Sequence, residues 1–339
     1  MISQDVIRAQ LGNCLTEARF PQWEQHYSRG KVRDMYRIQR KGYRLPRTGH
    51  GKPHGRRVII ATDRQSAHDH IVGTIPFYGQ VRNQIALWWF NQTDDIVPNA
   101  VLAAPDENVV VMEELAMFRV EMVVRAHLTG SSSTAIWTHY KNGERIFCGH
   151  RLPEGMAKNQ PLPMGSIITP STKAEDGHDE SISDEEVLAR GLVDPDTWDQ
   201  LTAMALALFA RGQELAEKRG LILVDTKYEL GETQDGLIMV ADEIHTPDSS
   251  RYWVRDTYKE RHARGEEPES LDKEPLRIWL KEHGISDGHV PELPDEERIK
   301  AAERYVALYE RMTGETFVPP DADVSVEERI EAAIAPFMS

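Results

Sequence analysis

The sequence predicts an α+β protein with two lobes, and three observations support this prediction. The chain has 339 residues, which corresponds to about two domains at roughly 150 residues each. Segments of strand type dominate the first third, and segments with helical periodicity dominate the part after residue 194. Strands followed by helices favour an α+β architecture over a doubly wound sheet, in which the two alternate.

The first strands are expected at Lys31–Ile38, which alternates loosely, and at Arg57–Thr62, a β-branched run of the buried type. Between them, residues 39–57 contain seven Lys/Arg and no acidic residue, and Gly and Pro indicate a loop. This basic insertion is either an anion-binding arm or a solvated extension of a hairpin.

The remaining elements follow from periodicity and from end signals. Asp194-Pro195 is typical of a helix start and Gly220 of a helix end, so a long helix is expected between them. Residues 151–185 are rich in Pro, Thr, Ser and His and are expected to form loops. The other expected elements are a helix at Asn83–Gln92, strands at Val109–Met112 and Arg119–Arg125, a strand pair within Leu221–Ile244, and helices near 272–283 and 295–313.

Composition excludes several classes of function. A formal net charge of −15 disfavours nucleic acid as a partner, because such binding depends on neutralising phosphates. Cys14 and Cys148 are the only cysteines, which excludes a disulfide framework and a thiolate zinc site. Charged residues interrupt the first twenty positions, and the longest strongly apolar run, Met204–Ala210, is too short to span a membrane. We therefore expect a cytoplasmic protein without membrane contact.

The segment of residues 221–243, LILVDTKYELGETQDGLIMVADE, predicts a hairpin whose turn is Asp235-Gly236. Pairing from a two-residue turn places Glu229 directly opposite Asp242, with Cβ atoms about 5 Å apart. A turn one residue longer would remove this pairing.

Asp225, Lys227 and Glu229 share one face of the first hairpin strand because side chains alternate along a strand. Opposed carboxylates destabilise a sheet unless something holds them, and oxygen ligands suit Mg²⁺ together with phosphate oxygens. The hairpin is therefore either a Mg²⁺ site or an exposed face whose charges point to water.

Four polar segments are further candidates for binding anions or substrates. Residues 30–34, GKVRD, combine a glycine that permits close backbone approach with Lys31 and Arg33, which suits a phosphate or a basic strand end at the surface. The segment VVRAHLTGSSS (123–133) suits an anionic phosphate through Arg125 and Gly130-Ser131. The segment TPDSSRYW (246–253) follows the hairpin directly, which puts Asp248, Ser249, Ser250 and Arg251 within reach of the same site, although both segments are also ordinary turn sequences. Residues 169–180, TPSTKAEDGHDE, form a loop long enough to be functional, although His178 with Asp179 is equally consistent with a capping cluster at the surface.

Taken together, these segments resemble the SAICAR synthetase family. The segments appear in the family's order over about residues 25–285: GKVRDMY, ATDRQSAHD, VVRAHLTGS, LPEGM, TPSTKAEDGHDE, VDTKYELG, ADEIHTPDSSRYW and DKEPLRIWL. The longest two, TPSTKAEDGHDE and DE-x-x-TPDSSR-x-W, are the most specific.

The resemblance implies a two-lobed fold related to ATP-grasp and kinase-like folds. It implies a sheet-rich ATP lobe at residues 1–122 and a larger metal- and substrate-binding lobe at residues 123–339. It also implies an ATP-dependent ligase of purine biosynthesis, which joins the carboxylate of carboxyaminoimidazole ribonucleotide (CAIR) to the amine of L-aspartate, with Mg²⁺. The partners would be these small molecules, and the protein would be a monomer or a small homo-oligomer.

The resemblance also implies roles for individual residues. ATP would be bound by Gly30, Lys31, Val32, Arg33, Glu121, Glu229 and Asp242, with Glu229 and Asp242 as Mg²⁺ ligands. Lys227 and Asp225 would be catalytic. Substrates would be bound by Asp63, Arg64, Ser66, Asp69, Arg125, Gly130, Ser131, Lys173, His178, Asp179, Asp248 and Arg251.

The chain departs from the usual family sequences at a few positions. The family usually reads TDRISAFD, where this chain has Gln65 and His68, and Lys-Gly after Ile-Pro, where it has Phe77-Tyr78-Gly79. His127 lies in AHLTGS, where the family reads GYLTGS. These departures keep open a second interpretation, a ligase for another carboxylate and amine. A third interpretation, a silent nucleotide-binding scaffold, would predict loss of Lys31, Lys227, Glu229 or Asp242, all of which are present.

Overall fold

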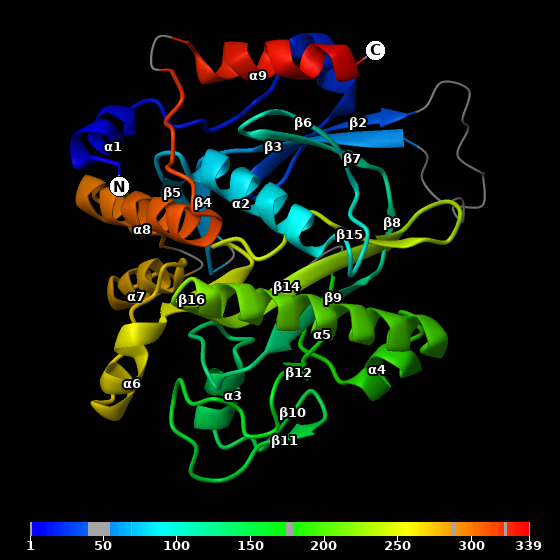
Figure 1. Ribbon diagram of the computed structural model, residues 1–339, viewed down its shortest axis with the longest axis vertical. Coiled ribbons are helices and arrows are strands. Elements are labelled where there is room, and N and C mark those ends of the chain that lie inside the picture. Colours follow the sequence, from blue (N-terminus) through cyan, green and yellow to red (C-terminus); the bar gives the residue numbers. More distant parts are fainter. Residues whose placement is uncertain are drawn as a thin grey trace.

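The computed structural model describes residues 2–39, 55–68, 70–173, 179–286, 289–321 and 324–338. Most of the basic insertion at 39–57 therefore lies outside the described residues, as do the candidates Asp69 and His178. Within the described part, two antiparallel sheets and a set of helices confirm the α+β class (Figure 1).

The first sheet has five strands in the order β1-β2-β3-β7-β6 within the described residues. Its strands are β1 (Tyr27–Arg29), β2 (Arg33–Gln39), β3 (Gly55–Ala61), β7 (Val109–Glu113) and β6 (Val101–Asp106). Helices cover both faces. Ile59 and Val110 face the main core with α2 (Tyr78–Thr93), whereas Val58 and Val109 face a second cluster with α9 (Val326–Ile334). The β-branched run of β3 is therefore buried on both sides, as predicted.

The second sheet is organised around one long strand, β14 (Leu221–Glu232), which crosses the middle of the molecule in Figure 1. Strands β9, β15, β16 and β8 all pair with β14 in antiparallel fashion. The other strands of this sheet are β8 (Ala116–Met117), β9 (Val120–Arg125), β12 (Ile167–Ile168), β13 (Ser171–Thr172), β15 (Ile238–Ala241) and β16 (Ser250–Val254). The boundary proposed between residues 122 and 123 falls within β9, and the division into two lobes stays a proposal.

The long helix α5 (Pro195–Lys218) begins and ends where the sequence predicts. The side chain of Asp194 accepts a hydrogen bond from the Thr197 amide at 3.0 Å, and Gly220 has a φ of +69°. A residue with positive φ is the usual end signal, which glycine meets without strain. The apolar face of α5 then packs on the second sheet, where Leu201 and Leu208 are buried.

The remaining elements are short hairpins and helices. Two-stranded sheets form from β4 (Arg64–Ala67) with β5 (His70–Thr74), and from β10 (Ile146–Phe147) with β11 (His150–Arg151). The other helices are α1 (Gln4–Gln10), α3 (Ile136–Lys141), α4 (Asp184–Ala189), α6 (Arg255–Ala263), α7 (Glu274–Glu282) and α8 (Asp295–Thr313), with 3₁₀ turns at Pro21–His26 and Ala335–Phe337. No helix in the described ranges is long and apolar enough to cross a membrane.

Candidate active site

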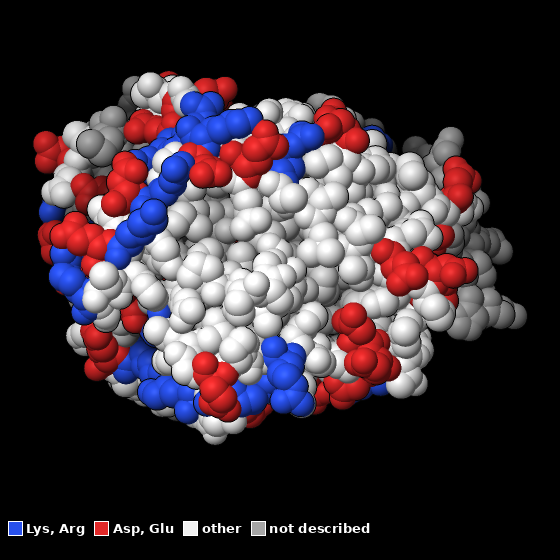
Figure 2. Space-filling view, turned by 60° about the horizontal axis from the view of Figure 1, so that its bottom comes forward, with Lys and Arg blue, Asp and Glu red and all other residues white. Residues whose placement is uncertain are grey.

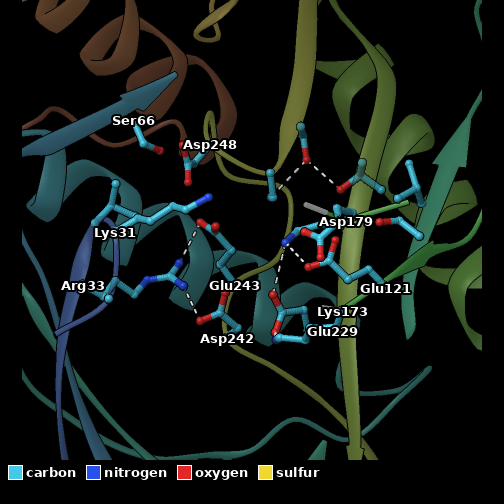
Figure 3. Close-up of a pocket in the computed structure, with 18 of the residues that line it drawn as sticks. Lys31, Arg33, Ser66, Glu121, Lys173, Asp179, Glu229, Asp242, Glu243 and Asp248 are labelled. Carbon is cyan, nitrogen blue, oxygen red and sulfur yellow. Dashed lines mark hydrogen bonds and ion pairs between the residues drawn. The ribbon is translucent and has the colours of Figure 1, made fainter. Parts of the chain in front are cut away.

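A cavity of about 860 Å³ opens between the two sheets, and most of the predicted site residues line it. Figure 3 shows the central part, with Lys31 and Arg33 pointing inward from one side and Glu121, Lys173 and Glu229 lying on the other. The predicted residues in the lining are Gly30, Lys31, Val32, Arg33, Ser66, Glu121, Arg125, Lys173, Asp179, Asp225, Lys227, Glu229, Asp242, Asp248 and Arg251.

At one end of the cavity, Arg33 joins the first sheet to the segment after β15. Its guanidinium is hydrogen-bonded to Asp242 and lies 2.8 Å from Glu243 (Figure 3). Burial alone would lower the pKa of Arg33, but these two carboxylates more than offset it and raise the pKa. We call the group Lys31, Arg33, Lys173, Lys227, Glu229, Asp242 and Glu243 the Arg33 end.

Glu229 lies between two lysines at the Arg33 end. Its carboxylate is hydrogen-bonded to Lys173 and lies 3.1 Å from the ammonium of Lys227, which also contacts Glu121 at 2.6 Å. Burial would raise the pKa of Glu229, but the two ammonium groups more than offset it and lower the pKa to about 2. Glu229 is therefore ionised at neutral pH, as a metal ligand must be.

The hairpin register differs by one residue from the prediction. Glu229 pairs with Ala241, not with Asp242, because the loop runs from Thr233 to Leu237 instead of being a two-residue turn. The Thr233 amide donates to the Leu237 carbonyl at 2.9 Å, which closes this longer loop. Asp242 comes after β15 with a φ of +63°. The two carboxylates still line one cavity, but the sheet pairing does not place them face to face.

At the other end of the cavity, Arg251 forms the centre of a buried ion-pair cluster. Its guanidinium contacts Asp225 at 2.6 Å and Glu274 at 3.1 Å, and Arg125 lies 3.6 Å from the same Asp225 carboxylate. Burial would raise the pKa of Glu274, but Arg251 and Arg277 more than offset it and lower the pKa to about 2. We call the group Arg125, Asp225, Arg251 and Glu274 the Arg251 end.

Asp248 occupies a third position in the lining. It accepts hydrogen bonds from Lys273 at 2.7 Å and from the Tyr78 hydroxyl at 2.8 Å. Burial would raise the pKa of Asp248, but the positive charges of Lys273 and Arg82 more than offset it and hold the pKa well below its usual range.

Four predicted residues within the described part do not line the cavity: Asp63, Arg64, Gly130 and Ser131. Arg64 is buried and donates to the carbonyls of Gly30 at 3.0 Å and Lys31 at 3.1 Å, so it supports the Gly30–Arg33 loop from behind. Asp63 accepts from the Leu15 and Gly79 amides, and burial raises its pKa to about 6.

Gly130 lies against the Arg251 end without lining the cavity. It has a φ of +102°, and a Cβ there would lie 2.7 Å from the Cβ of Ala135 and 3.0 Å from Arg251. Its role in the structure is to allow this close approach of the backbone.

Sequence reasoning missed two groups of lining residues. The first group is charged and includes Glu243, Lys273 and Arg277. The segment DKEPLRIWL contains the last two, but it lies far along the chain from the hairpin, so the sequence alone did not place them in the same cavity. The second is the apolar end, lined by Met35, Ile59, Met112, Leu115 and Met117. Alternation along β2, β3 and β7 could have pointed to it.

Of the positions at which the chain departs from the family, only His68 lines the cavity, among those described. Gln65 is fully buried, and its side-chain oxygen accepts a hydrogen bond from Tyr305 at 2.8 Å. His127 is buried, with its ring centroid 5.0 Å from that of Trp253. Tyr78 is buried too, beneath Asp248.

The fold and the cavity define a class of protein: an α+β protein with a large cavity between two antiparallel sheets, lined by Lys and Arg side chains together with carboxylates. Such a lining suits polyanionic ligands. Comparisons with known proteins identify the family. The SAICAR synthetase family model matches residues 26–290.

Two curated relatives and one solved structure illustrate the likeness. The chain is 44% identical over 319 residues to phosphoribosylaminoimidazole-succinocarboxamide synthase of Legionella pneumophila strain Lens, covering 94% of this chain and 96% of that protein. It is 46% identical over 314 residues to the chloroplastic synthase of Arabidopsis thaliana, covering 91% of this chain and 72% of that protein. A SAICAR synthase from Saccharomyces cerevisiae, complexed with SAICAR, has a TM-score of 0.70 and 28% identity, covering 86% of this chain and 95% of the other. The chain belongs to the SAICAR synthetase family and is a ligase.

Proposed function

We propose that the chain joins the carboxylate of CAIR to the amine of L-aspartate, with ATP becoming ADP and phosphate. Family membership supports this reaction. The observation that carries the proposal for this chain is the arrangement of the cavity, with the lysines, arginine and carboxylates of the Arg33 end and a second pair of arginines at the Arg251 end. Two clusters of cations suit two phosphorylated substrates, a nucleotide and a ribonucleotide.

The nucleotide would lie at the Arg33 end. A purine ring fits the apolar lining of Met35, Ile59 and Met112, and Lys31 and Arg33 would bind the phosphates. The turn before β2 is tight, since the Gly30 amide donates to the Arg33 carbonyl at 2.8 Å and a Cβ on Gly30 would lie 3.0 Å from that carbonyl oxygen. Glycine there lets phosphate approach the backbone closely.

The carboxylates of Glu229 and Asp242 fit a Mg²⁺ ion that also takes phosphate oxygens. Both line the cavity, and both are held by side-chain cations in this structure. Within the described ranges, no group of three His, Cys, Asp or Glu forms a metal site by itself, so phosphate oxygens and water would complete the coordination. When bound, Mg²⁺ would neutralise charge on the phosphates of the nucleotide.

CAIR would lie toward the Arg251 end, with its phosphate near Arg125 and Arg251. Asp225 holds both guanidiniums, so its catalytic role in this proposal is to fix their direction. Ser132 and Thr134 line this part of the cavity and are better placed for hydrogen bonds to substrate than Gly130 and Ser131. Lys173, Asp179 and Asp248 remain candidates for contacts with CAIR or L-aspartate.

The chemistry needs activation of the CAIR carboxylate, because a carboxylate is a poor electrophile. An oxygen of that carboxylate attacks the γ-phosphorus of ATP, the bond to the β-phosphate oxygen breaks, and ADP leaves. The aspartate amine then attacks the acyl carbon, the C–N bond forms, the C–O bond to phosphate breaks, and the nitrogen loses a proton. Lys227, held between Glu121 and Glu229, would offset negative charge near the transferred phosphoryl group.

The first test is ADP release by the purified protein with Mg²⁺-ATP, CAIR and L-aspartate, omitting each in turn. Turnover that requires all three, with the succinocarboxamide product detected by mass, is the expected result. A folded protein that binds ATP but does not turn over would favour the second interpretation, a ligase for another carboxylate and amine. Only His68 among the described departures lines the cavity, which favours the CAIR reaction.

Two further proposals concern the setting of the protein. We retain a cytoplasmic location, with which the two unpaired cysteines agree. We also retain a monomer or small homo-oligomer. Figure 2 shows a face with Lys, Arg, Asp and Glu gathered at its margins and few charged side chains at its centre. With a net charge of −15, a second copy would meet least repulsion there.

A further inference from the structure

Tyr305 on α8 contacts two segments that end in the cavity, although α8 lies beyond the residues matched by the family model. Its side chain is fully buried. The hydroxyl donates to the side-chain oxygen of Gln65 at 2.8 Å, and the ring lies 4.8 Å from that of Tyr78 between centroids. One side chain therefore supports both β4 and the start of α2.

The first contact leads to the β4–β5 hairpin. Gln65 donates from its side-chain nitrogen to the Ser66 carbonyl at 3.0 Å, and the pairing of β4 with β5 shifts register between these two residues. A register shift leaves the local backbone dependent on other bonds. Ser66 and His68, which line the cavity, follow directly.

The second contact leads to Asp248 and Lys273. The Tyr78 hydroxyl donates to Asp248 at 2.8 Å, and Asp248 contacts Lys273 at 2.7 Å. Both residues of this ion pair line the cavity. The Tyr78 ring, packed on Tyr305, sets the direction of the hydroxyl.

Helix α8 is held in place by contacts other than those of Tyr305. Arg298 on the same helix donates to the Thr74 carbonyl at 2.8 Å and to the Leu11 carbonyl at 2.9 Å. Tyr305 therefore transmits the position of a fixed helix to the two segments.

We propose that Tyr305 is a positioning residue for the part of the substrate site lined by Ser66, His68, Asp248 and Lys273. This inference rests on the proposed function and extends it. It assigns to helix α8 a role in binding CAIR or L-aspartate, although α8 contributes no residue to the cavity lining.

The test is Tyr305→Phe, which removes the hydroxyl and keeps the ring on Tyr78. The buried oxygen of Gln65 then lacks its donor, and we expect the KM of CAIR or of L-aspartate to rise on the order of fivefold. The KM of Mg²⁺-ATP should change less than about twofold, since the hydroxyl of Tyr305 donates to Gln65, which is not a residue of the Arg33 end, and Tyr305→Phe keeps the ring on Tyr78. Adding Gln65→Met also removes the bond from the Gln65 side chain to the Ser66 carbonyl, so the double variant should lose at least as much affinity as Tyr305→Phe alone.

Tyr309→Phe is the matched control. Tyr309 lies on the same helix, and its hydroxyl donates to Glu315 at 3.0 Å, away from the cavity. If Tyr305→Phe lowers the melting temperature as Tyr309→Phe does, with all KM values unchanged, Tyr305 is only structural and the inference is overturned. Wild-type protein that does not turn over the three substrates overturns the proposed function instead, and the inference with it.

Discussion

The two ends of the cavity use the same kinds of charged side chains in different ways. At the Arg33 end, charges meet across the gap between the sheets, and some of them are partly open: the side chains of Asp242 and Lys227 are 28% and 35% exposed, whereas that of Arg33 is 13% exposed. At the Arg251 end, Asp225, Arg251 and Arg125 come from neighbouring strands of one sheet and are 5% to 9% exposed.

This difference bears on what a ligand can replace. Partly exposed ion pairs contribute little to stability, so incoming phosphates and a cation can exchange with them at small cost. Buried pairs are costly to break, because a lone charge is left behind. The Arg33 end is therefore suited to a nucleotide that binds as ATP and dissociates as ADP. The Arg251 end is suited to bind the phosphate of one substrate in a site that is already formed.

Glu229→Gln should have the largest effect, because it removes the charge that we assign to Mg²⁺. Turnover should fall on the order of 100-fold or more, with a higher Mg²⁺ requirement. The melting temperature should also fall, because Lys173 and Lys227 lose a carboxylate whose pKa of about 2 reflects both pairings, so rates are compared at a temperature at which both proteins are folded. Steady-state rates over a Mg²⁺ titration measure this. Glu232→Gln, three residues along β14 and outside the cavity lining, is the control. Near-wild-type turnover with the same Mg²⁺ dependence would remove Glu229 from the metal site.

Arg125→Ala tests whether the Arg251 end binds the phosphate of CAIR. A charge-assisted bond to phosphate is worth about 1.5–3 kcal/mol, so the KM of CAIR should rise roughly 10- to 100-fold, and the KM of Mg²⁺-ATP should not. Asp225 keeps Arg251 as a partner at 2.6 Å, so folding should survive. Arg145→Ala, whose partner is Glu154 outside the cavity, is the control. An unchanged KM for CAIR would exclude Arg125 from the site.

The sequence predicted those features that depend on local signals. Asp194 and Gly220 mark the ends of α5, and alternation along β14 places Asp225, Lys227 and Glu229 in one cavity. These patterns need only near neighbours along the chain.

Features that depend on loop length or distant packing were beyond local reasoning. The hairpin register failed by one residue because Thr233 closes a longer loop. Arg64 was a candidate for substrate, yet its guanidinium turns back to the Gly30 carbonyl, a direction that strand periodicity does not give. Lys273 and Arg277 reach the cavity only because α7 packs beside a sheet whose last strand, β16, ends at Val254.

The dependence of stability on pH tests the ion pairs of the Arg251 end through Glu274. Its folded pKa of about 2 lies below its ordinary value of 4.5, so the carboxylate stabilises the fold fully above about pH 4.5. That contribution, about 3 kcal/mol at most, is lost as the pH falls from 4.5 to 2. Asp63 works in the opposite direction, because its pKa is raised to about 6 and its ionisation disfavours the fold as the pH rises through 4 to 6.

Glu274→Gln separates the two contributions, because it removes only the first. Urea unfolding from pH 3 to pH 7 should show the variant less stable than wild type by a few kcal/mol at neutral pH, since Arg251 loses a buried partner. The difference in the free energy of unfolding between the variant and the wild type should decrease toward pH 3. Glu282→Gln, at the exposed end of the same helix, should show a small gap at every pH. A difference in the free energy of unfolding that does not change with pH would mean that packing, and not charge, holds the Arg251 end together. In that case Arg125 and Arg251 could bind a substrate phosphate without breaking a strong ion pair.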